Sequence, residues 1–360
     1  MKILFLPGNI GSMQAITAQA LNKHPDVSAT CLFVSRHKYQ TANTPVIFLQ
    51  DEGSKINIFK WTFRRLKNIR TIQKMIKKAD VLHYVWGHAV KGGLDLKWAF
   101  RQNKAIVIEW VGSDIRNPEV LSGINKYYKK VLNNGYEYKK TELSNYRNII
   151  QKKFSDVKAI PVACAEMRLW IDKKMFPKTI LLYQRINVKD FIPLYPDVKN
   201  QKPLLLHSPS AKYAKGSNII IPIIEDLKKQ YDFEFILLHD VTRETVLDLM
   251  QKADIFIDQI ILGGYGMATM EAMSLGKPVM AYILPEVFEA GLSQECPIVN
   301  SNPDNFKEQL ILLLESSQLR HEIGKRSRAF VEKFHDADKI ALQLMDIYSK
   351  ALEEKEKKNA

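Results

Sequence analysis

The segment Asp254–Leu284 constrains the fold of this chain more than any other part of the sequence. Two short apolar runs, Asp254–Asp258 and Val279–Leu284, flank a glycine-bearing turn and a helical stretch over Met267–Leu275 that ends at Gly276. Buried parallel strands have such uninterrupted apolar sequences, and a glycine commonly follows the last helical residue. The segment therefore predicts a strand–helix–strand unit whose glycine-rich turn leads into the helix.

The start of this helix is a candidate phosphate site. The first backbone N–H groups of a helix have no partner within it, and the helix dipole is positive at that end. Gly266, Met267 and Ala268 supply these groups here, and Glu271 lies one turn further on, where it can accept hydrogen bonds from sugar hydroxyls. The alternative is a tight turn followed by a surface glutamate.

The same segment resembles the signature of the glycosyltransferase group 1 family, a retaining family with the GT-B fold. The family signature contains two glutamates separated by seven residues within a longer sequence frame. Three parts of this chain are similar to that frame: Tyr265-Gly266, Met270–Met273 and Gly276–Val279. The resemblance implies that Glu271 is the second glutamate, which holds the nucleotide ribose. The first glutamate, which contacts the donor sugar in the family, falls at position 263, where this chain has Gly263.

Two lysines upstream are the candidate cations for a diphosphate. The apolar run Pro203–His207 leads into Ser208–Gly216. In the resembled family this segment carries an arginine and a lysine that hold the donor pyrophosphate. Lys215 matches the lysine, whereas Ser210 stands at the arginine position and Lys212 is the substitute. Two cations near a helix N-terminus would neutralise the leaving group as its charge develops. The alternative is a pair of solvated loop lysines.

Three further candidates each follow a predicted strand of the N-terminal half: Gly11, His88 and Asp114. Open α/β sheets bind their ligands at the carboxyl ends of the strands. The resemblance implies that the loop of Gly11 lies across the cleft from the diphosphate. It also implies a histidine near the reacting groups at a position that holds Val111, so His88 and Asp114 are candidates for its catalytic role beside Lys215. A plain turn and structural hydrogen bonding remain the alternatives.

A chain of 360 residues is long enough for two domains. Strands and helices alternate along its whole length, which predicts an α/β fold with two Rossmann-like doubly wound domains. The resemblance implies that these domains face each other across a cleft. We expect an acceptor-binding domain over 1–190, a nucleotide-sugar-binding domain over 191–335, and a C-terminal helix over 336–360 that packs back on the first domain.

Charge is distributed unevenly between the halves. Residues 1–190 hold 33 Lys and Arg against 14 Asp and Glu, whereas the remainder holds 20 against 25. A basic half indicates an anionic partner. The basic helical segment 57–78, with Trp61 and Phe63, and the Tyr- and Lys-rich segment 125–153 are candidates for contact with an anionic membrane surface. For 57–78 the alternative is an ordinary outer helix, and no nucleic-acid-binding motif accompanies either segment.

Other patterns exclude several classes of function. Cys31, Cys164 and Cys296 are far apart and have no metal-binding spacing, so reduced core thiols are expected. Asp336-Ala-Asp338 begins a helix, which indicates a cap pair rather than a metal site. No apolar run is long enough for a transmembrane helix, and the apolar block at the N-terminus is too short for a signal peptide. We expect no cofactor and no metal.

The sequence thus predicts a glycosyltransferase of the hexosyltransferase type. It would transfer a sugar from a UDP- or GDP-linked donor to a glycan or lipid-linked acceptor, in the synthesis of a cell-surface polysaccharide or glycoconjugate. The resemblance implies a retaining, metal-independent reaction, and we expect a cytoplasmic protein, peripheral on the inner face of the cell membrane. The alternative is a GT-B-fold protein that binds nucleotide-sugars or polyanions without turnover.

Overall fold

The computed structural model describes residues 1–8, 10–33, 46–49, 58–143 and 145–357. The first residue of the predicted segment 57–78 and the side chain of Trp61 lie outside this part of the chain. The described residues form two compact units. Unit 1 comprises 1–115, 144–185 and 337–360, and unit 2 comprises 116–143 and 186–336.

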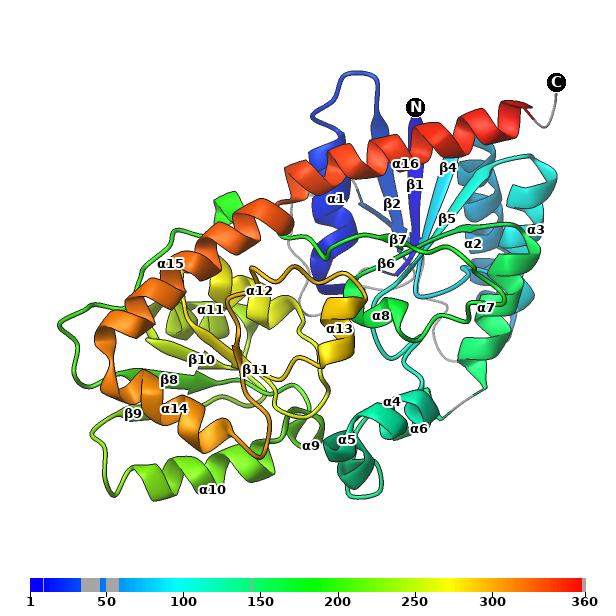
Figure 1. Ribbon diagram of the computed structural model, residues 1–360. Helices are drawn as coiled ribbons and strands as arrows, with labels where there is room; N and C mark the ends of the chain where they lie inside the picture. Colours follow the sequence, from blue (N-terminus) through cyan, green and yellow to red (C-terminus); the bar gives the residue numbers. More distant parts are fainter. Residues whose placement is uncertain (9, 34–45, 50–57, 144, 358–360) are drawn as a thin grey trace. The chain divides into compact units, whose positions relative to one another are not determined.

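Unit 1 is built on a seven-stranded parallel sheet with the order β3-β2-β1-β4-β5-β6-β7 (Figure 1). Its order reverses direction between β1 and β4, because β2 and β3 add to one side of β1 and β4–β7 to the other. The strands are β1 Lys2–Pro7, β2 Ser28–Phe33, β3 Val46–Phe48, β4 Val81–Val85, β5 Ala105–Trp110, β6 Ile160–Ala163 and β7 Ile180–Leu181.

The helices of unit 1 cover this sheet, and the last of them comes from the end of the chain. They are α1 Met13–Leu21, α2 Ile58–Lys78, α3 Leu94–Arg101, α7 Tyr146–Asp156, α8 Ala165–Arg168 and α16 Ala337–Lys357. The apolar face of α16, including Ile340 and Leu344, is buried in the same core as Phe5 and Ala18 (Figure 1). The expectation that the C-terminal helix returns to the first domain is thereby confirmed.

Unit 2 contains a five-stranded parallel sheet with the order β12-β11-β10-β8-β9. Its strands are β8 Leu204–His207, β9 Glu234–Leu237, β10 Ile255–Ile257, β11 Val279–Ala281 and β12 Val299–Asn300. Its helices are α4 Pro118–Ile124, α5 Lys126–Val131, α6 Lys139–Glu142, α9 Lys212–Lys215, α10 Ser217–Leu227, α11 Arg243–Lys252, α12 Met267–Ser274, α13 Pro285–Glu289, α14 Phe306–Glu315 and α15 Ser317–Phe334. Two parallel α/β sheets confirm the predicted fold class. No described helix has the length and apolar character that crossing a membrane requires.

The segment 116–143 differs from the predicted domain division, which assigned it to the first domain. It groups with unit 2, because its polar side chains bond to loops of that unit. Asn125 Nδ2 donates to the carbonyl of Ile261 at 2.7 Å, and the Tyr127 hydroxyl donates to Asp304 at 2.8 Å. Both partners are far from this segment in the sequence. The predicted domain division followed sequence order and therefore assigned the segment to the wrong unit.

The tyrosines of this segment are mostly buried rather than presented to solvent. Tyr127, Tyr128 and Tyr136 are 6%, 0% and 4% exposed. The buried carboxylate of Glu142 accepts hydrogen bonds from the hydroxyls of Tyr128 at 2.8 Å and Tyr136 at 2.9 Å, and Arg116 donates to it at 2.7 Å. These three tyrosines therefore serve the core of unit 2 and are not free to enter a membrane interface.

A buried charged network joins the sheet of unit 1 to α16. The guanidinium of Arg185 donates to both carboxylate oxygens of Glu109, at the end of β5. His83 lies 3.2 Å from the same carboxylate, and its Nδ1 lies 2.6 Å from the hydroxyl of Tyr348 in α16. All four side chains are almost completely buried. Although burial acts to raise the pKa of Glu109, Arg185 and His83 lower it to about 2.

Candidate functional site

The candidate site of unit 2 lies where the order of its sheet reverses, between β8 and β10. These strands are neighbours, with Leu205 beside Ile255 and His207 beside Ile257. Open α/β sheets bind ligands at such a switch point, outside the carboxyl ends of the strands. The loop after β8 leads to Lys215, and the loop after β10 leads to α12, so the fold brings two predicted elements of the site together.

Lys215 does not stand alone at this point. Its ammonium group forms an ion pair with the carboxylate of Asp258, the residue that follows β10. The other carboxylate oxygen of Asp258 accepts a hydrogen bond from the hydroxyl of Thr269, in the first turn of α12, at 2.6 Å. Asp258 therefore holds the Lys215 ammonium close to the start of α12. An ammonium has three donors, so one bond to Asp258 leaves two for an anion.

The N-terminus of α12 carries no side-chain cap. Gly266 occupies the N-cap position, and Met267 and Ala268 are the first helical residues. A glycine N-cap has no side-chain oxygen to accept from the first backbone N–H groups, as Ser, Thr, Asp or Asn would. The positive end of the helix and the Lys215 ammonium thus lie at the same strand ends, as an anion site requires.

Gln259 holds the glycine-rich loop in shape. It is 3% exposed, and its Nε2 donates to the backbone carbonyls of Gly264 and Tyr282. Its Oε1 accepts from the N–H groups of Ile261 at 3.0 Å and Leu262 at 2.6 Å. One side chain therefore satisfies three backbone groups of this turn and ties the turn to the residue after β11, which explains how this irregular segment tolerates burial.

Gly263, at the position of the first family glutamate, cannot be replaced without strain. Its φ of +86° lies in the left-handed region. A Cβ atom there would lie 2.5 Å from Cδ1 of the buried Leu284, and closer still to its Cγ. The left-handed backbone conformation and the close packing of Leu284 both require glycine at position 263. A side-chain carboxylate therefore does not fit at that position.

Glu271 is held by a residue that the sequence did not reveal. Arg243, the first residue of α11, donates from Nε at 2.8 Å and from Nη2 at 2.6 Å to Glu271 Oε1. Burial raises the pKa of Glu271, and the adjacent guanidinium opposes that shift. No sequence signal marked Arg243, because it is 28 residues from Glu271.

His207, the last residue of β8, is a second polar side chain that sequence analysis missed. Its Nδ1 lies 2.9 Å from the carbonyl of Ile257, and its Nε2 lies 2.8 Å from the hydroxyl of Ser217. Burial, the main cause, lowers its pKa to about 4. A neutral histidine here joins β8, β10 and α10 behind Lys215. The sequence feature that could have revealed His207 was its position as a polar residue at the end of an apolar strand.

Lys212 begins the one-turn helix that ends at Lys215, and its side chain is exposed. The predicted loop is thus partly helical. The carboxylate of Glu137 accepts hydrogen bonds from the backbone N–H groups of Tyr213 at 2.9 Å and Ala214 at 3.0 Å. The segment 116–143 therefore caps the helix that carries both predicted cations.

In unit 1, Asp114 is buried and its carboxylate closes a turn. It accepts from the N–H of Gly112 at 2.7 Å and, with longer distances of 3.4 Å, from that of Val111. This is the structural hydrogen bonding that sequence analysis kept as the alternative. A catalytic role for Asp114 stays a prediction.

His88 and Gly11 both follow strands at the switch point of unit 1. His88 is half-buried, and its Nε2 lies 3.2 Å from the ammonium of Lys153. Its pKa is lowered, by burial first, with Asp95 acting against the shift and Lys153 with it. Gly11 adopts a left-handed conformation with φ 54° in a 3-10 turn before α1. The structure thus places both residues at strand ends, and their roles remain predictions.

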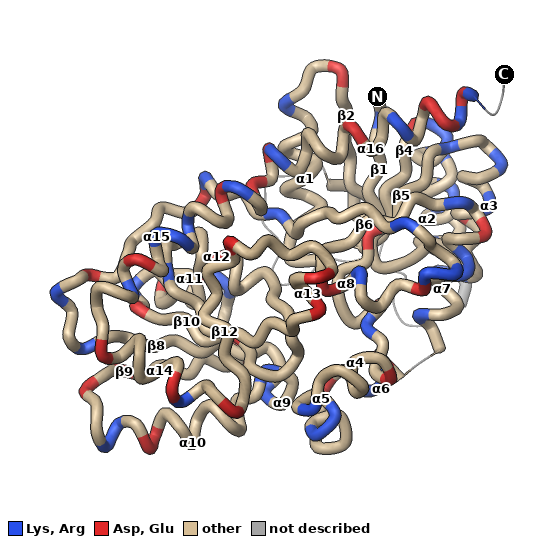
Figure 2. The backbone as a smooth tube through the Cα atoms, in the orientation of Figure 1, with Lys and Arg blue, Asp and Glu red and all other residues tan. Residues whose placement is uncertain are grey.

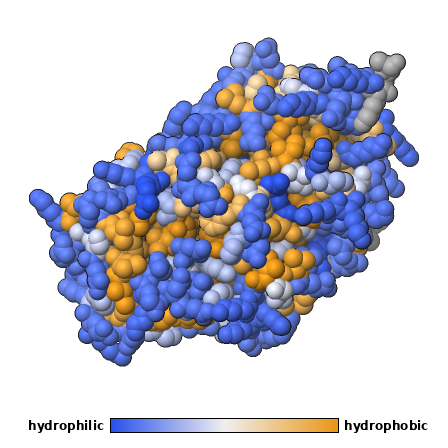
Figure 3. All heavy atoms as spheres, viewed as in Figure 1, coloured by the Kyte–Doolittle hydropathy of each residue, from blue (hydrophilic) through white to orange (hydrophobic). Residues whose placement is uncertain are grey.

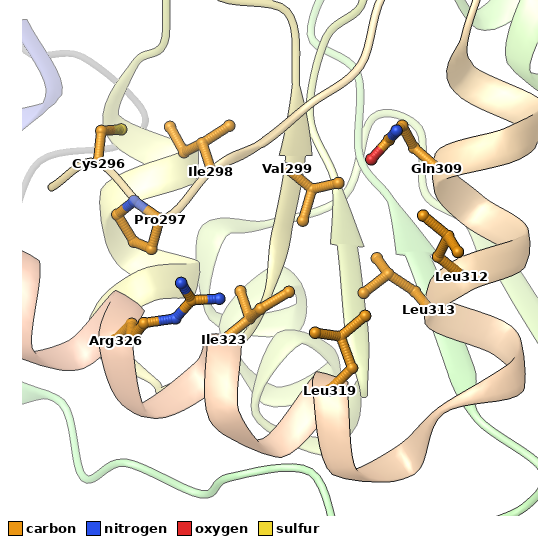
Figure 4. A pocket seen from close by; sticks show the side chains of 10 residues that line it. All are labelled: Cys296, Pro297, Ile298, Val299, Gln309, Leu312, Leu313, Leu319, Ile323 and Arg326. Carbon is orange, nitrogen blue, oxygen red and sulfur yellow. The ribbon is translucent and has the colours of Figure 1, made fainter. Parts of the chain in front are cut away.

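A separate pocket of about 310 Å³ lies between β12, α14 and α15 (Figure 4). In Figure 3, hydrophobic side chains are visible on the face of unit 2 that carries α14 and α15. The lining is mainly aliphatic, and it includes Arg326 and Cys296. Burial raises the pKa of the Cys296 thiol to about 11. The pocket contains none of the predicted site residues.

Within the described ranges, no three His, Cys, Asp or Glu side chains gather as metal ligands would.

Part of unit 2, including the segment that carries Arg243 and Glu271, matches a known protein family. Residues 224–330, which include α11, the glycine-rich loop and α12, match the family Glycosyl transferases group 1. A curated relative, an uncharacterized glycosyltransferase of Methanocaldococcus jannaschii, is 25% identical over 150 residues, which cover 33% of this chain. The match spans 40% of the length of that relative.

Solved structures resemble the whole chain in fold. The Anabaena protein HepE, in complex with UDP and glucose, has a TM-score of 0.61 at 12% identity and covers 97% of this chain and 99% of its own. A glycosyltransferase from Rickettsia africae has a TM-score of 0.61 at 15% identity, with 98% of each chain covered. Identities this low establish the fold alone. Residues 224–330 thus match the glycosyltransferase group 1 family, and the chain that contains them has the GT-B fold.

Proposed function

We propose that this protein is a glycosyltransferase that transfers a sugar from a nucleotide-sugar donor to a glycan or lipid-linked acceptor. One observation carries the proposal. At the switch point of unit 2, Asp258 joins the Lys215 ammonium to Thr269 in the first turn of α12, and this helix has an uncapped N-terminus and also carries Glu271. A nucleoside diphosphate has the matching groups, because its phosphates are anionic and its ribose carries hydroxyl donors.

The chemistry of the step follows from where charge develops. When the bond between the sugar and the diphosphate breaks, negative charge accumulates on the leaving phosphate oxygen. Preorganised positive groups stabilise this charge more in the transition state than in the ground state. We assign this role to Lys215 and to the amides of Met267 and Ala268, and Lys212 adds a cation on the same helical turn as Lys215. The structure of HepE in complex with UDP and glucose is consistent with such a ligand.

The experiment that tests the proposal is an assay with a panel of UDP- and GDP-sugars. We expect release of free nucleoside diphosphate, measured by mass spectrometry, from at least one donor when a glycan or lipid-linked acceptor is present. The anomeric configuration of the product, measured by NMR, tests the proposed retaining reaction. Activity with a chelator present tests metal independence. No release from any donor in the panel would contradict the proposal.

A binding protein without turnover is the second candidate, and two substitutions favour it. Val111 and Gly263 stand where the resembled family has a histidine and a glutamate, and Gly263 leaves no room for a longer side chain. Nucleotide-sugar binding measured by calorimetry, without release of nucleoside diphosphate, would support this candidate over the enzyme.

We further propose that unit 1 contacts an anionic membrane on the cytoplasmic side, where cell-surface polysaccharides or glycoconjugates are assembled on lipid carriers. The helix α2 carries eight Lys and Arg and no acidic residue, and Figure 2 shows cations recurring along α2 and α7. Phe63 is 69% exposed and Leu66 is 50% exposed on the same helix. Exposed apolar groups among cations combine insertion with electrostatic attraction.

Co-sedimentation with anionic and neutral vesicles over a salt series tests this contact. Attraction to anionic lipid amounts to about 1 kcal/mol per cation near the surface and is screened by salt. We therefore expect binding to anionic vesicles at low salt that weakens as salt increases. Changing Arg64, Arg65, Lys74 and Lys77 to Glu should abolish it, and wild-type protein that ignores anionic vesicles at low salt would contradict the contact.

A further inference from the structure

Arg243 and Glu271 form an ion pair in which two nitrogens of the guanidinium donate to one carboxylate oxygen. Nε and Nη2 of Arg243 lie 2.8 Å and 2.6 Å from Glu271 Oε1. The two residues come from different helices, α11 and α12, so the pair depends on how these helices pack. Among the described residues, none donates a hydrogen bond to Glu271 Oε2.

The pair lies mostly out of solvent. The side chain of Glu271 is 10% exposed and that of Arg243 is 26% exposed. A carboxylate in such surroundings favours the protonated form unless a cation stabilises its charge. Two hydrogen bonds to one oxygen also fix the rotation of the carboxylate. Arg243 therefore favours the ionised form of Glu271 and sets the direction in which Oε2 points.

We propose that Arg243 is a positioning residue for the nucleotide site: it fixes Glu271 so that Oε2 accepts hydrogen bonds from the ribose hydroxyls of the donor. This inference rests on the proposed function. Arg243 lies outside the family signature. The inference also assigns different roles to the two carboxylate oxygens of Glu271: Oε1 accepts from Arg243, and Oε2 accepts from the ribose.

The test compares the affinity for nucleotides with and without ribose hydroxyls. Calorimetry measures binding of UDP and GDP, and of the 2′,3′-dideoxy form of whichever nucleotide binds. A hydrogen bond to a charged group is worth about 1.5–3 kcal/mol, which corresponds to a preference of about 10- to 100-fold for the ribose form in the wild type.

The variants separate positioning from general stability. Arg243→Met keeps the length of the side chain but removes its charge and donors. It should reduce the ribose preference to about threefold or less, because Glu271 then loses both the cation that favours its ionised form and the donors that orient it. Arg243→Lys keeps the charge without the paired donors and should give an intermediate preference. Lys333→Met removes the cation of an exposed ion pair with Glu295 in the same unit and should leave the preference unchanged.

Each outcome decides a different question. If the wild type binds neither UDP nor GDP, the proposed function and this inference both fail. If it binds one of them without a ribose preference, nucleotide binding stands and the role of Glu271 fails, and this inference with it. If Arg243→Met keeps the full preference, only the inference fails. Should Arg243→Met not fold, an unchanged preference in Arg243→Lys overturns the inference equally.

Discussion

Replacing Gly263 with alanine should destabilise unit 2 far more than an ordinary glycine substitution. A non-glycine residue in the left-handed conformation costs about 1–2 kcal/mol, and the φ of Gly263 is +86°. The new Cβ would lie 2.5 Å from Leu284 Cδ1, and such overpacking costs about 1–3 kcal/mol. The two effects together predict a loss of roughly 2–5 kcal/mol in the free energy of unfolding.

Differential scanning calorimetry of the full chain measures this loss. For domains of this size, about 2–4 °C of unfolding temperature corresponds to 1 kcal/mol, so we expect a decrease of about 4–20 °C. Gly123→Ala is the matched control, because Gly123 lies within α4 with no atom within 4 Å of its added Cβ and no left-handed φ. That control should be neutral or stabilising by about 0.5–1 kcal/mol.

A double variant separates the steric part from the backbone part. Leu284→Ala alone removes buried atoms and should be destabilising, but it also clears the space that the new Cβ requires. Gly263→Ala should therefore cost less in the Leu284→Ala background than in the wild type, by about 1–3 kcal/mol. An unfolding temperature of Gly263→Ala within about 2 °C of the wild type would refute the reasoning. So would equal costs in both backgrounds.

Three more expectations concern side chains that the structure joins. Lys215→Ala should lower transfer by about 100- to 1,000-fold and should also destabilise the protein, because it leaves the buried carboxylate of Asp258 without its cation. Adding Asp258→Asn should restore the unfolding temperature but not transfer, and wild-type transfer in the double variant would contradict the role of Lys215. Gln259→Leu should cost about 3 kcal/mol or more, because four backbone groups, two buried and two part-buried, lose their partner, and an unchanged unfolding temperature would argue against this account. Because the folded pKa of Glu109 is about 2 and its ordinary value is 4.5, the stability it contributes is present above pH 4.5 and is lost as pH falls towards 2. Acid titration of circular dichroism should show this loss, and Glu109→Gln should flatten it.

The sequence determined the type and order of most elements by itself. Apolar runs of strand length alternate with amphipathic helices, and this local periodicity is enough to predict two parallel α/β sheets. The glycine-rich turn and its helix were also predictable, because Gly266, Gly276 and the apolar residues between them act within one short segment. Glu271 and Lys215 were found in the same way, through motifs of a few consecutive residues.

Only the tertiary structure decided how these residues are held. The partners of Lys215 and Glu271 are Asp258 and Arg243, which are 43 and 28 residues away in the sequence. The segment 116–143 joined unit 2 through contacts with α9 and with the glycine-rich loop, more than 75 residues further along. Such pairings depend on which strands are neighbours and how helices pack on them. Sequence periodicity indicates which face of a helix or strand is buried, but it does not indicate which other element packs against that face.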